Sequence, residues 1–174
     1  RTARFLFANG ATAPAEEGAS LFGDALPAEP AKPASLAIPS DHPVIARVAA
    51  RGHADLRVIE IAEPATDRER KKTVITVDDV RKAVDFAKLT SAEGGWRVVI
   101  VDAAEDMNIN AANALLKSLE EPPPMTVYLL VSHAPGRLLP TIRSRCRRLA
   151  FQPLEREVVE RLLSELLPDL PDRD

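Results

Sequence analysis

The sequence predicts an α/β protein built on a parallel sheet. Two apolar runs, in residues 96–102 and 126–132, are continuous rather than alternating, which is typical of strands covered on both faces. Helix-like patterns separate these runs, and strands that alternate with helices join into parallel sheets through right-handed crossovers. The chain has 174 residues, of which 45% are apolar and 28% charged, and this is enough for one sizeable core.

The first part of the chain contains little packed structure. Residues 1–8 form a helix-like run with no cap before it, so we expect a core that is incomplete at its N-terminus. Residues 9–40 are rich in Ala, Pro, Glu and Ser without apolar periodicity, which predicts a flexible insertion. A cap and a proline at 41–43 open a short helix that Gly52 closes, and residues 55–62 alternate as a strand does.

Two helices and a further strand are expected after residue 75. The first helix begins at Thr76 and ends before the glycines at 94–95. Its apolar positions share one face: Val77, Val80, Val84 and Ala87. Asn110 is expected to cap the second helix, which the prolines at 122–124 stop, and residues 148–151 are expected to form another strand.

An amphipathic helix is predicted near the C-terminus. Its apolar residues recur at helical spacing: Val158, Leu162, Leu163 and Leu166. Gln152-Pro153 precedes it and is typical of a domain boundary. We therefore expect one domain over residues 1–152 and the first helix of a second, helical domain over residues 153–174.

Composition narrows the classes of partner. The formal net charge is −3, so no global basic field favours nucleic acid or an anionic membrane. The single cysteine excludes an internal disulfide and every multi-cysteine zinc pattern, and the three histidines lack metal-ligand spacing. The sequence has neither an apolar run long enough to span a bilayer nor a signal-peptide pattern, which predicts a soluble cytoplasmic protein with no membrane partner.

Asp102 is the first candidate site residue. It follows the aliphatic run 98–101, and the crevices that bind ligands in open α/β sheets lie at the carboxyl ends of such strands. It thus resembles the Walker B carboxylate that holds Mg²⁺ in P-loop NTPases, although an aspartate in this place can also be a turn or cap residue. Glu105 and Asp106 are expected on the solvent side of a short helix.

Three motifs carry a resemblance to a known family. They are Val101-Asp-Ala-Ala104, Asn113-Ala-Leu-Leu-Lys-Ser-Leu-Glu-Glu-Pro-Pro123 and Leu138-Leu-Pro-Thr-Ile-Arg-Ser-Arg-Cys146. Together they resemble the bacterial clamp-loader subunits of DNA polymerase III. The resemblance is strong over 96–152 and weak over 41–95, and it implies a P-loop NTPase-like (AAA+) core followed by a helical lid.

Within that family, the residue after Asp102 separates two branches. Hydrolysing gamma and tau subunits place there the glutamate that activates water, whereas Ala103 is similar to the delta-prime branch. No G-x-x-x-x-G-K-[ST] phosphate loop occurs in the sequence. The resemblance therefore implies a subunit with little or no hydrolysis of its own.

The resemblance also assigns roles to residues further along. Ser144-Arg145-Cys146 matches a motif whose arginine reaches ATP bound by the neighbouring subunit, so Arg145 is the predicted finger that acts in trans. Ser132 falls at the sensor 1 position. Implied partners are gamma/tau and delta subunits and, indirectly, the sliding clamp and primer-template DNA. ATP and Mg²⁺ are implied for the subunit interface or the full protein; no cofactor is expected in this chain alone and no zinc, because the insertion lacks cysteines.

The arginines near the motif are clustered. Five of them fall within twelve residues: Arg137, Arg143, Arg145, Arg147 and Arg148. No acidic residue occurs between Pro122 and Leu154, so this one-signed cluster favours a surface that faces phosphate or a partner over random exposure. Cys146 is expected to be a small buried neighbour without a redox role.

Three functions remain open at this point. The leading hypothesis is a non-hydrolysing clamp-loader subunit that supplies Arg145 to a neighbour's ATP site. The second is a catalytically active clamp-loader ATPase of the gamma/tau type, against which Ala103 argues. The third is a DNA-binding module that uses the arginine cluster at 137–148.

Overall fold

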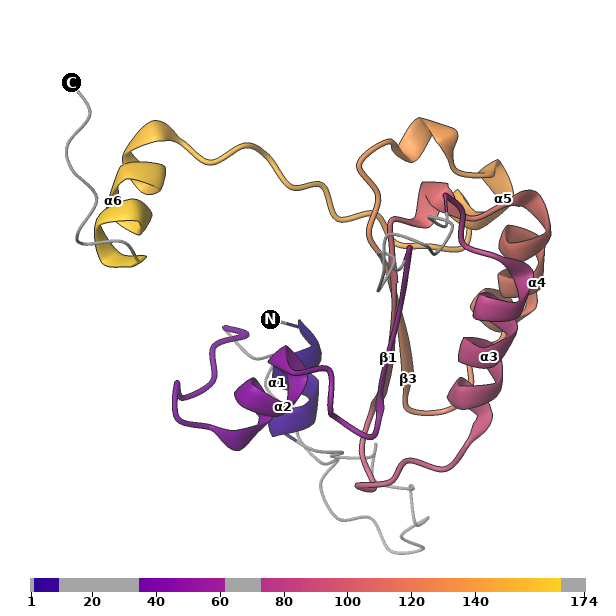
Figure 1. The fold of residues 1–174 in the computed structure, drawn as a ribbon, viewed down its shortest axis with the longest axis horizontal. Coiled ribbons are helices and arrows are strands. Elements are labelled where there is room, and N and C mark those ends of the chain that lie inside the picture. The colour runs from indigo at the N-terminus through magenta and orange to yellow at the C-terminus, as the bar shows by residue number, and fades with distance from the viewer. Residues whose placement is uncertain (1, 10–34, 62–72, 167–174) are drawn as a thin grey trace, which may run out of the picture.

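The computed structural model describes residues 2–9, 35–61 and 73–166 (Figure 1). Most of the predicted insertion at 9–40 lies outside the described residues, and so does the last residue of the strand predicted at 55–62.

Three parallel strands form the sheet, in the order β1-β2-β3. They are β1 (Leu56–Glu60), β2 (Arg97–Asp102) and β3 (Thr126–Leu130). β2 lies in the centre and is covered on both faces, as the continuous apolar run predicted, whereas β3 is only half-buried. The predicted parallel α/β class is confirmed.

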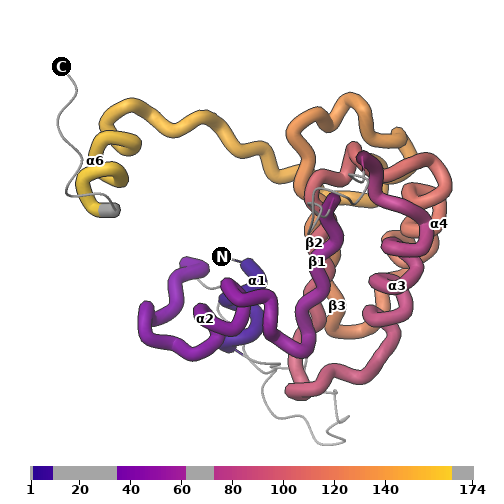
Figure 2. Tube along the Cα trace, viewed as in Figure 1, coloured from indigo at the N-terminus to yellow at the C-terminus, as the bar shows by residue number. Residues whose placement is uncertain are grey.

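One face of the sheet is covered by two long helices, α3 (Val77–Lys88) and α4 (Ile109–Glu120), which lie side by side in Figures 1 and 2. The main core lies between them and the sheet. Its fully buried members include Val80, Val99 and Leu115. The apolar stripe predicted after Thr76 therefore faces this core, with Val80 and Ala87 buried and Val84 partly buried.

The other face carries two short helices, α1 (Thr2–Ala8) and α2 (Pro43–Ala49). A smaller core of Ala3, Leu56 and Val98 lies beneath them. The His53 ring is buried and stacks on Phe7 with ring centroids 3.8 Å apart, which gives this histidine a structural role.

The start of α4 differs from the prediction. Asn108, rather than Asn110, is the N-cap: its side-chain oxygen accepts a hydrogen bond of 2.9 Å from the backbone N–H of Ala111. Asn110 lies one residue inside the helix and is exposed. At α3 the predicted boundary holds, because Thr76 is the N-cap and its backbone N–H donates to the carboxylate of Asp79.

The strand predicted at 148–151 is wrong. These residues are extended but pair with no other described strand, and Leu149 and Phe151 are 76% and 86% exposed. Before them come the short helices η1 (Ala104–Asp106), η2 (Pro135–Arg137) and α5 (Pro140–Arg143).

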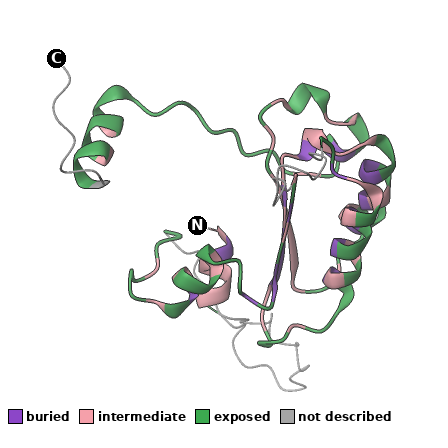
Figure 3. Ribbon diagram, viewed as in Figure 1, coloured by how far each residue is buried: buried purple, intermediate pink, exposed green. Residues whose placement is uncertain are grey.

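The predicted C-terminal helix forms as α6 (Arg156–Leu166). It stands apart from the sheet at the end of an extended segment, and most of its surface is exposed (Figures 1 and 3). Its assignment to a second domain stays a prediction. Within the described residues, every helix is too short or too polar to cross a bilayer.

Candidate functional site

Asp102 closes β2 at the carboxyl end of the sheet, as predicted. Its side chain is 47% exposed, and one carboxylate oxygen lies 4.0 Å from Nε2 of His133. Glu60 occupies the matching position on β1 and forms an ion pair with Arg51. The central strand therefore presents an accessible carboxylate at the edge where open α/β sheets bind ligands.

Glu105 occupies a different place from the one predicted. Rather than facing solvent, its Oε1 accepts hydrogen bonds of 2.9 Å each from the backbone N–H groups of His133 and Ala134. Partial burial raises the pKa of Glu105, but the hydrogen bonds from backbone N–H groups outweigh it, so the pKa falls below its usual value. These hydrogen bonds to Glu105 therefore connect the turn after β2 to the loop after β3.

Ser132, the predicted sensor 1 residue, lies in this loop after β3. β3 ends at Leu130, two residues earlier than the predicted run. Pairing nevertheless continues for one residue, because the N–H of Val131 donates to the carbonyl of Val101 over 2.9 Å. Ser132 is half-buried and follows the strand next to that of Asp102, so the structure brings these two predicted residues to the same end of the sheet.

The described residues do not form a metal site by themselves. In the ranges 2–9, 35–61 and 73–166, no group of three or more His, Cys, Asp or Glu side chains is arranged to hold an ion. Asp102 and Ser132 supply too few oxygen ligands for Mg²⁺, which requires octahedral coordination and is usually completed by phosphates and water. The absence of zinc stays a prediction.

Arg145 lies at the surface, just after α5. Its side chain is 31% exposed and forms an ion pair with Glu120, the last residue of α4. Nε donates to Oε1 of Glu120 over 2.7 Å, and Nη2 donates to the same oxygen. Nη1 donates to the carbonyl of Thr141 over 2.8 Å and to Oγ of Ser144 over 3.3 Å.

The other arginines of the cluster are less engaged. All four are exposed and have no ion-pair partner within the described part of the chain: Arg137, Arg143, Arg147 and Arg148. Cys146 is half-buried, and burial raises the pKa of its thiol, which fits a packing role. Arg145 is thus the only arginine of the motif region that the described contacts hold in a defined position.

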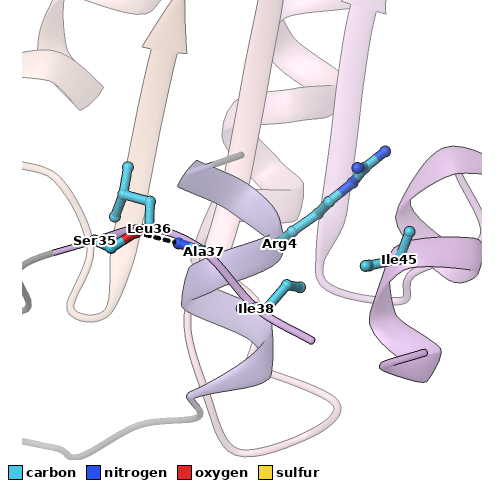
Figure 4. Close-up of a pocket in the computed structure, with 6 residues that line it drawn as sticks. All are labelled: Arg4, Ser35, Leu36, Ala37, Ile38 and Ile45. Atoms are coloured by element: carbon cyan, nitrogen blue, oxygen red, sulfur yellow. Dashed lines mark hydrogen bonds between the residues drawn. The ribbon is translucent and has the colours of Figure 1, made fainter. Parts of the chain in front are cut away.

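Two cavities in the described part of the chain are lined by residues other than Asp102 and Arg145. The larger, about 280 Å³, lies between α1, α2 and residues 35–38 and contains none of the predicted site residues (Figure 4). Its lining is mostly apolar, and the Arg4 side chain extends away from Ser35. The smaller, about 110 Å³, lies between η1, α4 and α5 beside Glu105 and Arg137. Neither contains Asp102 or Arg145.

The sheet, the helices on both faces and the carboxylate at the end of β2 define the class of this protein. A crystal structure of a DNA polymerase III gamma subunit-related protein from Thermotoga maritima shares the fold with a TM-score of 0.54 and 30% identity. The likeness covers 72% of this chain and 41% of that one. The fold is a P-loop NTPase-like core of the AAA+ class.

A family match makes the assignment more specific. The family described as DNA polymerase III, delta subunit, matches residues 2–155, and the chain belongs to it. The DNA polymerase III subunit delta' of Pseudomonas aeruginosa is 47% identical over 124 residues, and that of Bacillus subtilis is 46% identical over 81. The chain is therefore a delta-prime-type subunit of the clamp-loader family, as the motifs predicted.

The relatives differ in length and in branch. The Pseudomonas aeruginosa match covers 71% of this chain but 36% of the relative, and the Bacillus subtilis match covers 47% and 24%. The gamma/tau subunit of Mycobacterium tuberculosis is 37% identical over 90 residues, which is 52% of this chain and 16% of that one. The chain thus spans about a third or less of these curated relatives.

Proposed function

We propose that this chain is part of a clamp-loader subunit that hydrolyses no ATP itself and supplies Arg145 to the ATP site of a neighbouring gamma/tau subunit. In this role it acts in the cytoplasm with gamma/tau and delta subunits, and through the assembled complex on the sliding clamp and primer-template DNA. ATP and Mg²⁺ belong to the interface, where Arg145 neutralises charge on the γ-phosphoryl group.

The single observation that carries the proposal is the position of the Arg145 guanidinium. It lies on the surface with its side chain 31% exposed, within the Ser144-Arg145-Cys146 motif and beside arginines that have no acidic partner among the described residues. A guanidinium buried in the core could not contact phosphate on another protein. An exposed one can, because guanidinium is always charged and its N–H groups match phosphate oxygens.

The surroundings of Asp102 support the non-hydrolysing part of the proposal. The next residue is Ala103, which has no group that could activate water. The nearest acid along the chain toward the C-terminus is Glu105, and its carboxylate already accepts two backbone N–H groups. A carboxylate engaged in this way, with a lowered pKa, is a poor general base for water.

The test is Arg145→Ala in the full-length subunit, assembled with its partner subunits. Arg143→Ala is the matched control, because Arg143 is exposed, lies two residues away and has no ion pair among the described residues. We expect assembly to be unchanged and the DNA-dependent ATPase rate to fall by roughly 10³-fold or more at the affected site, the range for such fingers. A rate equal to that of the control would overturn the proposal.

An ATPase assay on the isolated full-length subunit decides between this function and an autonomous ATPase of the gamma/tau type. The proposal expects no turnover above background. Measurable turnover that depends on Asp102 would favour the autonomous enzyme instead.

A further inference from the structure

We propose that Glu120 is a positioning residue that holds Arg145 against its own chain until the phosphate of a neighbouring nucleotide displaces it. This inference rests on the proposed function, because it concerns how the same guanidinium becomes available. It adds Glu120 to the site. The carboxylate of Glu120 and the nucleotide phosphate then compete for the guanidinium of Arg145.

The hydrogen bonds of Arg145 carry the inference. A guanidinium has five N–H groups. Nε and Nη2 each donate one to Glu120, and Nη1 donates to the Thr141 carbonyl and to the Ser144 hydroxyl. A forked contact with phosphate needs two parallel N–H groups, and the structure leaves one uncommitted. Arg145 must therefore release some of these contacts to bind phosphate through a fork.

The place of Glu120 in the fold provides a second, independent argument. It is the last residue of α4 and is followed by Glu121, so two carboxylates lie at the negative end of a helix dipole. Carboxylates in this place are unfavourable for the helix, although Lys117 in the last turn offsets part of the charge. The contact with Arg145 compensates Glu120, whereas the carboxylate of Glu121 is exposed and has no ion-pair partner among the described residues.

The strength of the Glu120–Arg145 pair suits an exchangeable contact. The two side chains are 45% and 31% exposed, so water screens the pair and it can open without disturbing the core. A nucleotide phosphate presents more charge and more oxygen atoms than a carboxylate does, and it can therefore replace Glu120 as the partner.

The experiment compares Glu120→Gln with Glu121→Gln in the full-length subunit within the assembled complex. The first variant removes the charge that holds Arg145, and the second removes an equal charge one residue away. We expect Glu120→Gln to raise the ATPase rate without DNA by roughly two- to fivefold and to lower the KM for ATP, the range that an exposed ion pair allows. Glu121→Gln should match the unmodified complex.

Combination with Arg145→Ala separates this inference from the proposed function. If Glu120 acts through Arg145, the double variant will have the rate of Arg145→Ala alone, and Glu120→Asp will restore part of the original behaviour. A large effect of Arg145→Ala together with an unchanged or lower rate for Glu120→Gln overturns the inference and leaves the proposed function intact. No effect of Arg145→Ala overturns both.

Discussion

At the scale of single residues, Asp55 is a buried carboxylate that connects two parts of the fold. It is 3% exposed and accepts hydrogen bonds from Oγ of Ser91 and from the backbone N–H groups of Ala92 and Glu93, at 2.8–3.2 Å. These bonds tie the connection between α3 and β2 to the start of β1.

We predict that Asp55→Ala lowers the free energy of unfolding by roughly 1–3 kcal/mol, because the three donors lose their acceptor in a partly buried turn. Urea denaturation of the full-length subunit measures the change. Asp85→Ala is the control, since Asp85 forms only an exposed ion pair with Lys88, and its loss should cost less than about 1 kcal/mol. Equal losses for the two variants would contradict the assigned role of Asp55.

Glu105 should make stability depend on pH. Its pKa in the folded chain lies below the ordinary value of 4.5, so its contribution is present above that value and disappears as the pH falls through the folded pKa. We predict that Glu105→Gln shows a smaller loss of stability than the unmodified subunit between about pH 6 and pH 3. Thermal unfolding across this range measures the pH dependence of stability. Glu165→Gln on α6 is the control, and it should leave that pH dependence as it is in the unmodified subunit.

The sequence predicted the place of Asp102 but not the contacts of Glu105 and Glu120. Asp102 follows from a local rule, because an aliphatic run specifies the buried strand and the next polar residue ends it. Glu105 meets the N–H groups of residues 133–134, and Glu120 meets Arg145, across distances in sequence that no local pattern encodes. The only local signal was an acid at the unfavourable end of a helix.

At the scale of elements, the cap of α4 can be tested directly. We predict that Asn108→Ala lowers the free energy of unfolding by about 0.5–2 kcal/mol, since its side chain satisfies the N–H of Ala111. Asn110→Ala should be neutral or slightly stabilising, because Asn110 is an exposed helical position and alanine has the higher helix propensity. Chemical denaturation of both variants measures the two losses of stability. A larger loss for Asn110→Ala than for Asn108→Ala would identify Asn110 as the cap.

The same scale shows why one apolar run became a strand and another did not. Residues 98–101 contain only β-branched aliphatic residues and lie between two strands that complete their hydrogen bonds. Residues 148–151 contain two large apolar side chains, but no described strand pairs with them. Composition alone does not reveal whether a partner strand exists, and this is why the second prediction failed.

At the scale of the whole molecule, stability is concentrated in the layer between the sheet and α3 and α4. Leu115 is fully buried there, whereas Leu163 on α6 is 46% exposed. We predict that Leu115→Ala lowers the free energy of unfolding by about 2–5 kcal/mol and that Leu163→Ala costs less than about 0.5 kcal/mol. Denaturation of the full-length subunit measures both, and a large effect of Leu163→Ala would show that α6 is packed against another part of that subunit.

The parallel arrangement of β1, β2 and β3 has a kinetic consequence. Each strand joins its neighbour only after the chain has traversed a complete helix and returned, so every pairing closes a long loop before it gains hydrogen bonds. Chains with such non-local contacts fold more slowly than helical bundles of similar size. The amides of β2 should therefore gain protection late in refolding, and until then the strand edges that pair in the folded sheet are exposed to other nascent chains during synthesis.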